Sequence, residues 1–351
     1  MNEKTAFEQF LDSQDETGWA SALNHLLPEI HLVDQNAVQI WFHFFPLELF
    51  RILNTVEDKT DLIHKFALQG NYELANQIDS SHTFLYGHRY WKMVKDEIVL
   101  RAQSFQSAES DLIGEIKSVA TQIGEREKIP LELLIGIAAV GLMTLAQTGL
   151  DKFAAATGAI LLDAQQLKKT PDKILAERAQ NDSQGIFGFL KTVDKKWTVT
   201  WNENQSNAKF KIIDTEEIAT AAARDQSSDW KKADERCLEG VIPVECRSAA
   251  CGTCWIGVLG GAEKLSAVGA REAKSMKRFG YLFSDEPQPL IRLACQAQAK
   301  GAVSIVIPPW NGVFGKHLYQ ENIPADELIP ATTSAKATRA VVKEATKNQL
   351  L

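Results

Sequence analysis

The sequence predicts an α+β protein, with an all-α N-terminal domain followed by a domain that contains strands. In the first half, apolar residues recur at helical spacing, as at Leu62 and Phe66. In the second half the period changes, because residues 196–203 and 208–214 alternate polar and apolar side chains. The polar, turn-rich segment 181–185 lies between the two patterns. A chain of 351 residues is long enough for two domains of ordinary size.

These patterns divide the chain into three predicted parts. The first is a helical domain over residues 1–185, and the second is a strand-containing domain over 186–316. Residues 317–351 begin with a proline-containing linker, and we expect them to form a flexible tail.

Several helices of the first domain have recognisable boundaries. Asp34 or Asn36 is expected to cap a helix, and Pro46 suits the first turn of the next one. Longer helices are predicted over residues 87–105 and 109–125.

Residues 133–150 form the longest uncharged apolar stretch of the helical domain. Such a stretch is near the lower length limit for a membrane span, and it also contains glycine, threonine and glutamine. A helix that is apolar on all sides is equally typical of the centre of a helical domain. We therefore expect a buried central helix, with membrane contact through 133–150 as the alternative.

Six of the seven histidines lie in the first half, so a metal or haem site there has to be considered. They are His25, His31, His43, His64, His82 and His88. Two Asp-x-x-His pairs occur, Asp61/His64 and Asp79/His82, but the Glu-x-x-His repeats of di-iron bundles are absent from the sequence. The expectation is that these histidines are hydrogen-bonded at helix ends and interfaces.

The second half opens with a predicted antiparallel hairpin. Residues 196–203 and 208–214 are its strands, and a short polar turn joins them. A short helix is expected over 215–225, because acidic residues lie in its first turn and apolar residues follow.

Four of the five cysteines have a spacing that points to a metal centre. Cys246, Cys251 and Cys254 follow the pattern C-x4-C-x2-C, and Cys295 lies far along the chain. This is the spacing of plant-type [2Fe–2S] proteins. Zinc remains an alternative, although structural zinc sites usually pair two close cysteine motifs. Disulfides require an oxidising compartment, and residues 1–20 are acidic and lack the apolar run of a signal peptide. The fifth cysteine, Cys237, is expected to be a free thiol.

Residues 196–309 resemble a plant-type [2Fe–2S] ferredoxin domain with the β-grasp fold. The sequence IPVECRSAACGTCWIGVLGG at 242–261 resembles the cluster loop of that family, and RLACQ at 292–296 resembles its last ligand block. The resemblance implies that a [2Fe–2S] cluster is bound by the four residues Cys246, Cys251, Cys254 and Cys295. It leaves the helical half unassigned.

The chain departs from the family at three places. Ala249 occupies a position that is often glycine, so the backbone there is expected to differ or to avoid positive φ. Residues 227–240 are an insertion, and residues 270–283 are expected to form an extra helix. Small residues of the loop should let backbone N–H groups point at the cysteine sulfurs, namely those of Ser248, Ala249, Ala250, Gly252 and Thr253.

The predicted function is one-electron transfer by a low-potential [2Fe–2S] cluster, with the helical domain docking a redox partner protein, a reductase or an oxidoreductase. The formal net charge of −7 and the lack of long basic runs give no support for nucleic-acid binding. A cytoplasmic location is expected. The chain has no flavin or nicotinamide motif, so an electron carrier is expected rather than an enzyme. Two alternatives remain: a redox or oxygen sensor whose cluster state controls the helical domain, and an electron-transfer subunit of a larger oxidoreductase.

Overall fold

A computed structural model describes residues 3–105, 111–180, 195–281 and 288–315. The chain forms two compact units. One contains the described residues of Met1–Lys59 and Asn71–Glu177 together with Glu203–Gln205, and the other contains the remaining described residues. The predicted linker at 181–185 and the predicted tail at 317–351 lie outside the described residues.

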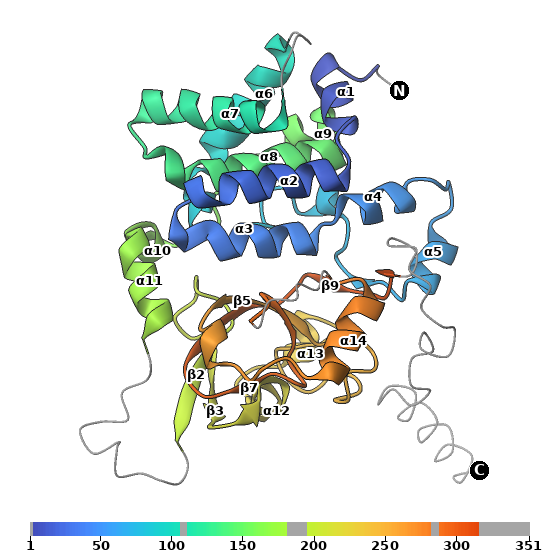
Figure 1. The fold of residues 1–351 in the computed structure, drawn as a ribbon, viewed down its shortest axis with the longest axis vertical. Coiled ribbons are helices and arrows are strands. Elements are labelled where there is room, and N and C mark those ends of the chain that lie inside the picture. The colour runs from blue at the N-terminus through green and yellow to red at the C-terminus, as the bar shows by residue number, and fades with distance from the viewer. Residues whose placement is uncertain (1–2, 106–110, 181–194, 282–287, 316–351) are drawn as a thin grey trace. The chain divides into compact units, whose positions relative to one another are not determined.

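The first unit is helical (Figure 1). Its α-helices are α1 (Ala6–Asp12), α2 (Glu16–Leu26), α3 (Leu32–Phe44), α4 (Leu47–Leu53), α6 (Trp91–Ser104), α7 (Leu112–Glu127), α8 (Ile135–Thr148), α9 (Leu150–Ala155) and α10 (Ala164–Leu167). Its 3-10 helices are η1 (Leu27–Glu29), η2 (Leu74–Asn76), η3 (Tyr86–Tyr90) and η4 (Leu131–Leu133). Helix α11 (Pro171–Ala179) follows these and ends at the division between the two units.

Helix α8 is the centre of the helical unit. Twelve of its fourteen residues are buried, and it packs against α1, α3, α6, α7 and α9. Gly141 allows the closest approach, because a Cβ there would lie 2.5 Å from Ile98. Among the described residues, one segment, Leu131–Thr148, is long and apolar enough to cross a membrane, but 78% of it is buried inside the fold. The structure therefore supports the interpretation of 133–150 as a core helix.

The predicted cap of α3 was wrong. The helix begins at Leu32, and the Nδ1 atom of His31 accepts the backbone N–H of Val33 at 3.2 Å. Asp34 lies inside the helix with 1% of its surface exposed. Its carboxylate accepts the backbone N–H groups of Tyr86 and Gly87 at 2.6 and 2.7 Å. The carboxylate thus fixes a distant turn instead of its own helix end.

The boundaries of two other predicted helices also changed. The segment predicted as one helix over 87–105 is η3 followed by α6, because the chain first forms a 3-10 turn. The helix predicted over 109–125 is α7, and Asp111 caps it by accepting the N–H of Gly114. Both helices exist, and the differences lie at their ends.

The second unit contains a mixed five-stranded sheet in the order β3-β2-β8-β5-β6. Its strands are β2 (Lys196–Thr200), β3 (Lys209–Ile213), β5 (Trp255–Gly260), β6 (Ile291–Leu293) and β8 (Val303–Val306). Strands β2 and β8 are parallel, and the other neighbours are antiparallel. The predicted hairpin is confirmed, since Lys196 pairs with Ile213 and Thr200 with Lys209. With helices in the first half and this sheet in the second, the protein has the predicted α+β class.

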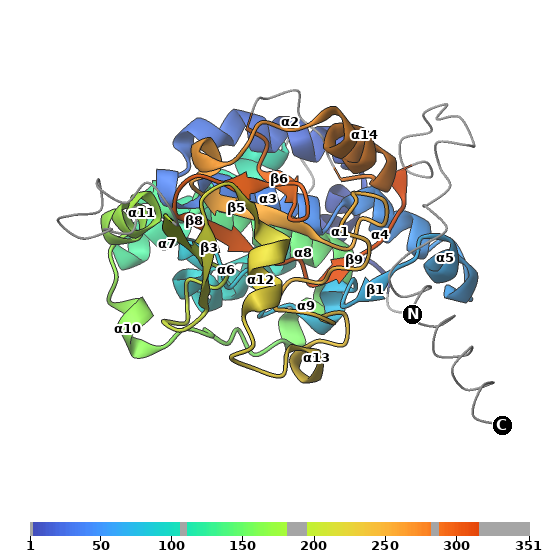
Figure 2. The same ribbon diagram turned by 90° about the horizontal axis from the view of Figure 1, so that it is seen from below.

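Short helices and strands complete the second unit (Figure 2). They are α5 (Thr60–Lys65), β1 (Gln69–Gly70), β4 (Glu216–Glu217), α12 (Ile218–Arg224), α13 (Trp230–Ala233), η6 (Ala262–Lys264), α14 (Ala270–Phe279), β7 (Gln298–Ala299) and β9 (Trp310–Asn311). The helix predicted over 215–225 is shorter and packs on β3 as α12. Residues 60–70 belong to this unit, because β1 pairs with β9. The predicted extra helix exists as α14 and packs on β6.

Candidate metal centre

The loop before β5 turns sharply around the cysteines. Arg247, Ala249 and Gly252 have φ angles of +55°, +58° and +74°. Positive φ is unfavourable for residues with a Cβ by roughly 1–2 kcal/mol. The expectation that Ala249 avoids this region was wrong, and the residue adopts it while only 2% exposed. At Gly252 a side chain is also excluded by space, because a Cβ would lie 2.9 Å from the ring of Phe279.

Sheet pairing brings the remote Cys295 to this loop. Cys254 comes directly before β5, and Cys295 follows β6. The two strands are antiparallel with Trp255 opposite Leu293, so the cysteines next to them meet at one edge. The backbone N–H of Ala294 donates to the carbonyl of Cys254 at 2.9 Å, which fixes this register at the site.

The four cysteines form two pairs. Side-chain hydrogen bonding couples Cys246 to Cys251 and Cys254 to Cys295. Charge interactions link the pairs, Cys251 with Cys254 and Cys246 with Cys295. The pairs differ in exposure: Cys254 and Cys295 are 2% and 0% exposed, whereas Cys246 and Cys251 are half-buried.

Hydrogen bonds favour the anionic form of one sulfur in each pair. The thiol of Cys251 and the N–H groups of Ser248 and Ala250 lower the pKa of Cys246 to about 4, against the opposing effect of burial. The two N–H groups lie 3.4 and 3.2 Å from its sulfur. The thiol of Cys254, and then the side chain of Gln296, lower the pKa of Cys295 in the same way.

The partner thiols are shifted in the opposite direction. Hydrogen bonding to Cys246 and burial raise the pKa of Cys251, and hydrogen bonding to Cys295 and burial raise that of Cys254. Within each pair, hydrogen bonding therefore favours the thiolate form of one sulfur and the protonated form of the other. Binding of a metal would require that proton to leave, because thiolates are the ligands.

Of the five loop N–H groups expected to face the sulfurs, Ser248 and Ala250 donate to Cys246. The backbone groups of Thr253 and Ala249 act on Cys251 and Cys295 respectively, and each lowers the pKa of its sulfur. Donors from the loop thus reach three of the four sulfurs. Such bonds partly offset the negative charge of a bound cluster.

This arrangement fits a binuclear cluster. In the described part of the chain, no group of three or more His, Cys, Asp or Glu side chains is arranged to hold one metal ion. In a [2Fe–2S] cluster each iron takes two protein ligands, and bridging sulfides complete its coordination. Two pairs of cysteines, with loop donors around them, match the number and kind of ligands that such a cluster requires.

Cys237 lies apart from the two pairs. Its sulfur donates to the carbonyl of Val241 at 3.1 Å, and it is 4% exposed. Burial, with a smaller effect from Asp234, raises the pKa of the thiol to about 12. A thiol in this environment is unreactive.

A buried ion pair fixes the strand that precedes Cys295. Arg292 and Glu272 are each 1% exposed, and two N–H groups of Arg292 donate to the carboxylate at 2.9 Å. The carboxylate also accepts the N–H of Leu293 at 2.9 Å. Glu272 belongs to α14, so the extra helix is fastened to β6. Sequence patterns gave no sign of this pair, because its partners lie far apart in the chain.

The predicted Asp-x-x-His pairs do not act as units. Asp61 forms an ion pair with Lys65 at 2.6 Å. Asp79 accepts from the indole of Trp91 at 2.8 Å, the hydroxyl of Thr157 at 2.8 Å and the N–H of Gly158 at 3.1 Å. The carboxylates therefore serve helix and turn contacts instead of a metal.

His82 and His88 form a buried hydrogen-bonded chain. The N–H of Leu161 donates to His88 Nε2 at 2.9 Å, so the proton of His88 is on Nδ1. That Nδ1–H donates to His82 Nδ1 at 2.9 Å, and His82 Nε2–H then donates to the carbonyl of Ile78 at 3.1 Å. Burial lowers the pKa of His88 to about 4 and that of His82 well below 6.5. The pair is neutral and its nitrogens are all used, as expected for structural histidines.

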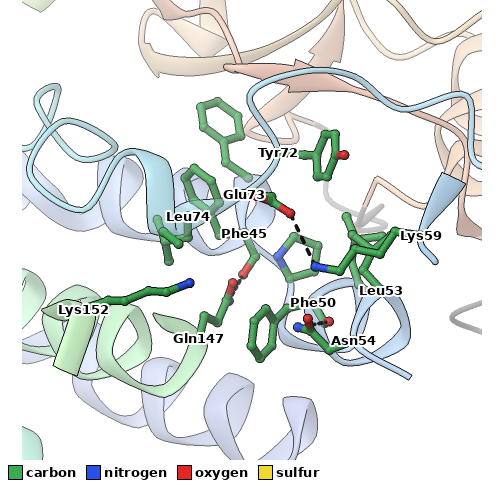
Figure 3. Close-up of a pocket in the computed structure, with 14 residues that line it drawn as sticks. Phe45, Phe50, Leu53, Asn54, Lys59, Tyr72, Glu73, Leu74, Gln147 and Lys152 are labelled. Carbon is green, nitrogen blue, oxygen red and sulfur yellow. Dashed lines mark hydrogen bonds and ion pairs between the residues drawn. The ribbon is translucent and has the colours of Figure 1, made fainter. Parts of the chain in front are cut away.

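A pocket of about 100 Å³ lies in the helical unit, between α4, the segment with η2, and the adjoining ends of α8 and α9 (Figure 3). Its lining includes the apolar residues Phe45, Phe50, Leu53 and Leu74. Three charged residues also line it: Lys59 and Glu73, which form an ion pair at 3.4 Å, and Lys152.

Comparison with known proteins identifies the second half of the chain. Residues 203–300 match the family model of the 2Fe-2S iron-sulfur cluster binding domain, and this range includes all four paired cysteines. Comparison with curated proteins found no match, and comparison with solved structures found none. The family binds a [2Fe–2S] cluster and serves electron transfer. The C-terminal half of this chain therefore carries a 2Fe-2S iron-sulfur cluster binding domain of the ferredoxin type.

Proposed function

We propose that this protein is a one-electron carrier in which two cysteine pairs hold the cluster, Cys246 with Cys251 and Cys254 with Cys295. The observation that carries this proposal is the strand register, with Trp255 opposite Leu293, which brings the remote Cys295 to Cys254 and the cysteine loop. When bound, the cluster accepts and releases single electrons at low potential, near about −400 mV for plant-type ligand sets. Because four cysteine sulfurs together with the bridging sulfides would fill the coordination of both irons, the protein would supply a path for charge and no substrate site.

Because the two cysteine pairs differ in exposure, an electron can pass to a partner more readily on the loop side of the cluster than on the sheet side. Cys246 and Cys251 are half-buried, whereas Cys254 and Cys295 are almost fully enclosed by β5 and β6. A partner can therefore approach the loop side more closely than the sheet side. Loop N–H donors and the backbone turns at positive φ keep the sulfurs on this side in place.

We further propose that the helical unit docks the redox partner, and that the protein acts in the cytoplasm. Acidic residues outnumber basic ones in the chain, and the excess lies in its first half. A field of this sign attracts partners with basic surfaces and raises their association rate.

The cluster proposal is tested by analysis of the purified full chain. We expect two irons and two sulfides per chain, visible absorption typical of [2Fe–2S] proteins, and an electron paramagnetic resonance signal after reduction with dithionite. A colourless protein with stoichiometric zinc would overturn the proposal.

Docking is tested with cytochrome c, a basic protein, as the electron acceptor of the reduced chain. The exposed residues Glu57 and Glu125 are changed to lysine, and Glu263→Lys in the second unit is the matched charge control. We expect the rate to fall with ionic strength and to fall further in the two helical-unit variants. An equal effect of Glu263→Lys would contradict docking through the helical unit.

A further inference from the structure

Two side chains contact backbone carbonyls of the cysteine loop, one from the last turn of α14 and one from just after the helix. The Nη2 atom of Arg278 donates to the carbonyl of Ala250 at 2.7 Å. The hydroxyl of Tyr281 donates to the carbonyl of Gly252. Both acceptors lie within the C-x4-C-x2-C segment, one on each side of Cys251.

Both side chains are held in place by the surrounding structure. The guanidinium of Arg278 lies 4.7 Å from the ring centre of Phe279. Tyr281 stacks on Trp255 with ring centres 4.1 Å apart and an interplanar angle of 9°. Helix α14 is in turn fastened to β6 by the buried pair of Glu272 and Arg292. The loop contacts are therefore part of a rigid support.

When a loop carbonyl is held toward α14, the N–H group of the next residue points away from α14. In a trans peptide the C=O and the following N–H point in opposite directions. The bond from Arg278 thus turns the N–H of Cys251 away from α14, and the bond from Tyr281 does the same for the N–H of Thr253. The backbone of Thr253 forms a hydrogen bond with the Cys251 sulfur, as this geometry requires.

Arg278 also adds positive charge near the more exposed pair of sulfurs. Its guanidinium interacts electrostatically with Cys246 and Cys251, and it is half-buried, where screening by water is reduced. A positive charge and inward N–H groups both favour the cluster state with one more electron.

We propose that Arg278 and Tyr281 are positioning residues that raise the reduction potential of the cluster by orienting loop peptides toward the sulfurs. This inference rests on the proposed function, since it requires a cluster at the four cysteines. It assigns a role to α14, the extra helix of this chain. Arg278 acts by charge and by position, whereas Tyr281 acts by position alone.

The test uses the full-length, cluster-loaded protein and three variants: Arg278→Gln, Arg278→Lys and Tyr281→Phe. The reduction potential is measured by spectroelectrochemistry, and resonance Raman bands report the strength of the iron–sulfur bonds. Arg271→Gln is the matched control, because it removes the same charge from the exposed first turn of α14.

We expect Arg278→Gln to lower the ratio of reduced to oxidised cluster about tenfold at a fixed applied potential, which is 59 mV for a one-electron couple. Arg278→Lys should have a reduction potential close to that of the wild type. Tyr281→Phe, which does not change the charge, should lower the reduction potential by less than Arg278→Gln does. The Raman bands should shift in Arg278→Gln and Tyr281→Phe, and Arg271→Gln should match the wild type.

Potentials and Raman bands equal to those of the wild type in Arg278→Gln and Tyr281→Phe would overturn the inference while the proposed function stands. If Arg278→Gln does not retain its cluster, Tyr281→Phe decides the question alone. A wild-type protein without iron would instead refute the proposed function.

Discussion

The histidine chain of the helical unit is a buried cluster of titratable side chains, and the cysteine pairs of the sheet-containing unit form a second cluster that is buried on one side and half-buried on the other. At the histidines, a backbone N–H at one end and a backbone carbonyl at the other complete the hydrogen bonding, and both rings are neutral. At the cysteines, hydrogen bonding within a pair lowers the pKa of one thiol and raises that of the other, so that the charge of one sulfur opposes the charge of the other. The first cluster is complete with the protein's own groups, whereas two neighbouring thiolates require added positive charge. Whether the protein's own groups complete the cluster is therefore what distinguishes a structural cluster from a candidate binding site, although both consist of polar, titratable side chains.

The largest expected effect comes from removing one member of a cysteine pair. Changing Cys246, Cys251, Cys254 or Cys295 to serine, one at a time, should abolish the visible absorption of the cluster, because one iron loses a thiolate. The matched control is Cys237→Ser, which removes a thiol outside the pairs and should retain the colour. Loss of the cluster in the control, or its retention in all four ligand variants, would contradict the ligand set.

The ion pair of Glu272 and Arg292 in the sheet-containing unit is complete without any added group, as the histidine chain is. Breaking it should therefore reduce the stability of the fold. Glu272→Gln leaves the guanidinium of Arg292 buried without its charge partner, and should reduce the free energy of unfolding by about 3–5 kcal/mol. Urea unfolding of the full chain measures the change. The exposed Glu263→Gln should alter stability by less than about 0.5 kcal/mol. Equal changes in the free energy of unfolding for the two substitutions would show that the buried ion pair does not contribute to stability.

Acid should weaken the helical unit through its histidines. Because burial lowers the folded pKa of His88 to about 4, the unfolded chain binds more protons below pH 6.5. The stabilisation is complete above about pH 6.5 and is lost as the pH falls toward 4, by roughly 3 kcal/mol for this residue. Denaturant unfolding at several pH values measures it. A double variant, His82→Leu with His88→Leu, should show a flatter profile, and an unchanged slope would contradict this assignment.

Breaking the histidine chain at one ring should reduce the free energy of unfolding by an amount comparable to that for the ion pair. His82→Leu leaves the Nδ1–H of His88 and the carbonyl of Ile78 without their partners, and each unsatisfied group costs about 1–3 kcal/mol. His25→Leu is a control at an exposed histidine and should have little effect. Thermal unfolding compares the two variants, and equal midpoints would argue against the chain described here.

The smallest change in stability is expected from a substitution in the backbone of the cysteine loop. Ala249→Gly removes the steric cost of a φ of +58°, but it also adds freedom to the unfolded chain. The two terms oppose each other, so we expect a gain in stability of less than about 1 kcal/mol and an unchanged cluster spectrum. A clear loss of stability would mean that the methyl group of Ala249 contributes packing that outweighs the strain.

Local patterns predicted the features that depend on neighbouring residues. Polar–apolar alternation was enough for the hairpin of β2 and β3, and a fully apolar run was enough for the core helix α8. The cysteine spacing predicted the metal centre because thiols this close together in one loop suit thiolate ligation of iron better than an ordinary disulfide.

Features that depend on distant contacts were missed. The two-residue strand β1 has no pattern of its own and forms through its pairing with β9. Asp34 resembled a helix cap, yet its carboxylate holds the turn at Tyr86 and Gly87. Arg278 and Tyr281 were not singled out within the predicted extra helix, because only the fold brings them against the cysteine loop.

Trp255 gives the molecule a built-in optical reporter. The indole follows Cys254 directly in the chain, is 1% exposed and donates to the carbonyl of Trp310 at 3.0 Å. An indole this close to an absorbing iron–sulfur group transfers its excitation energy instead of emitting light. Ultraviolet fluorescence should therefore brighten as the centre is lost, so that loading and decay can be followed in real time without any attached dye.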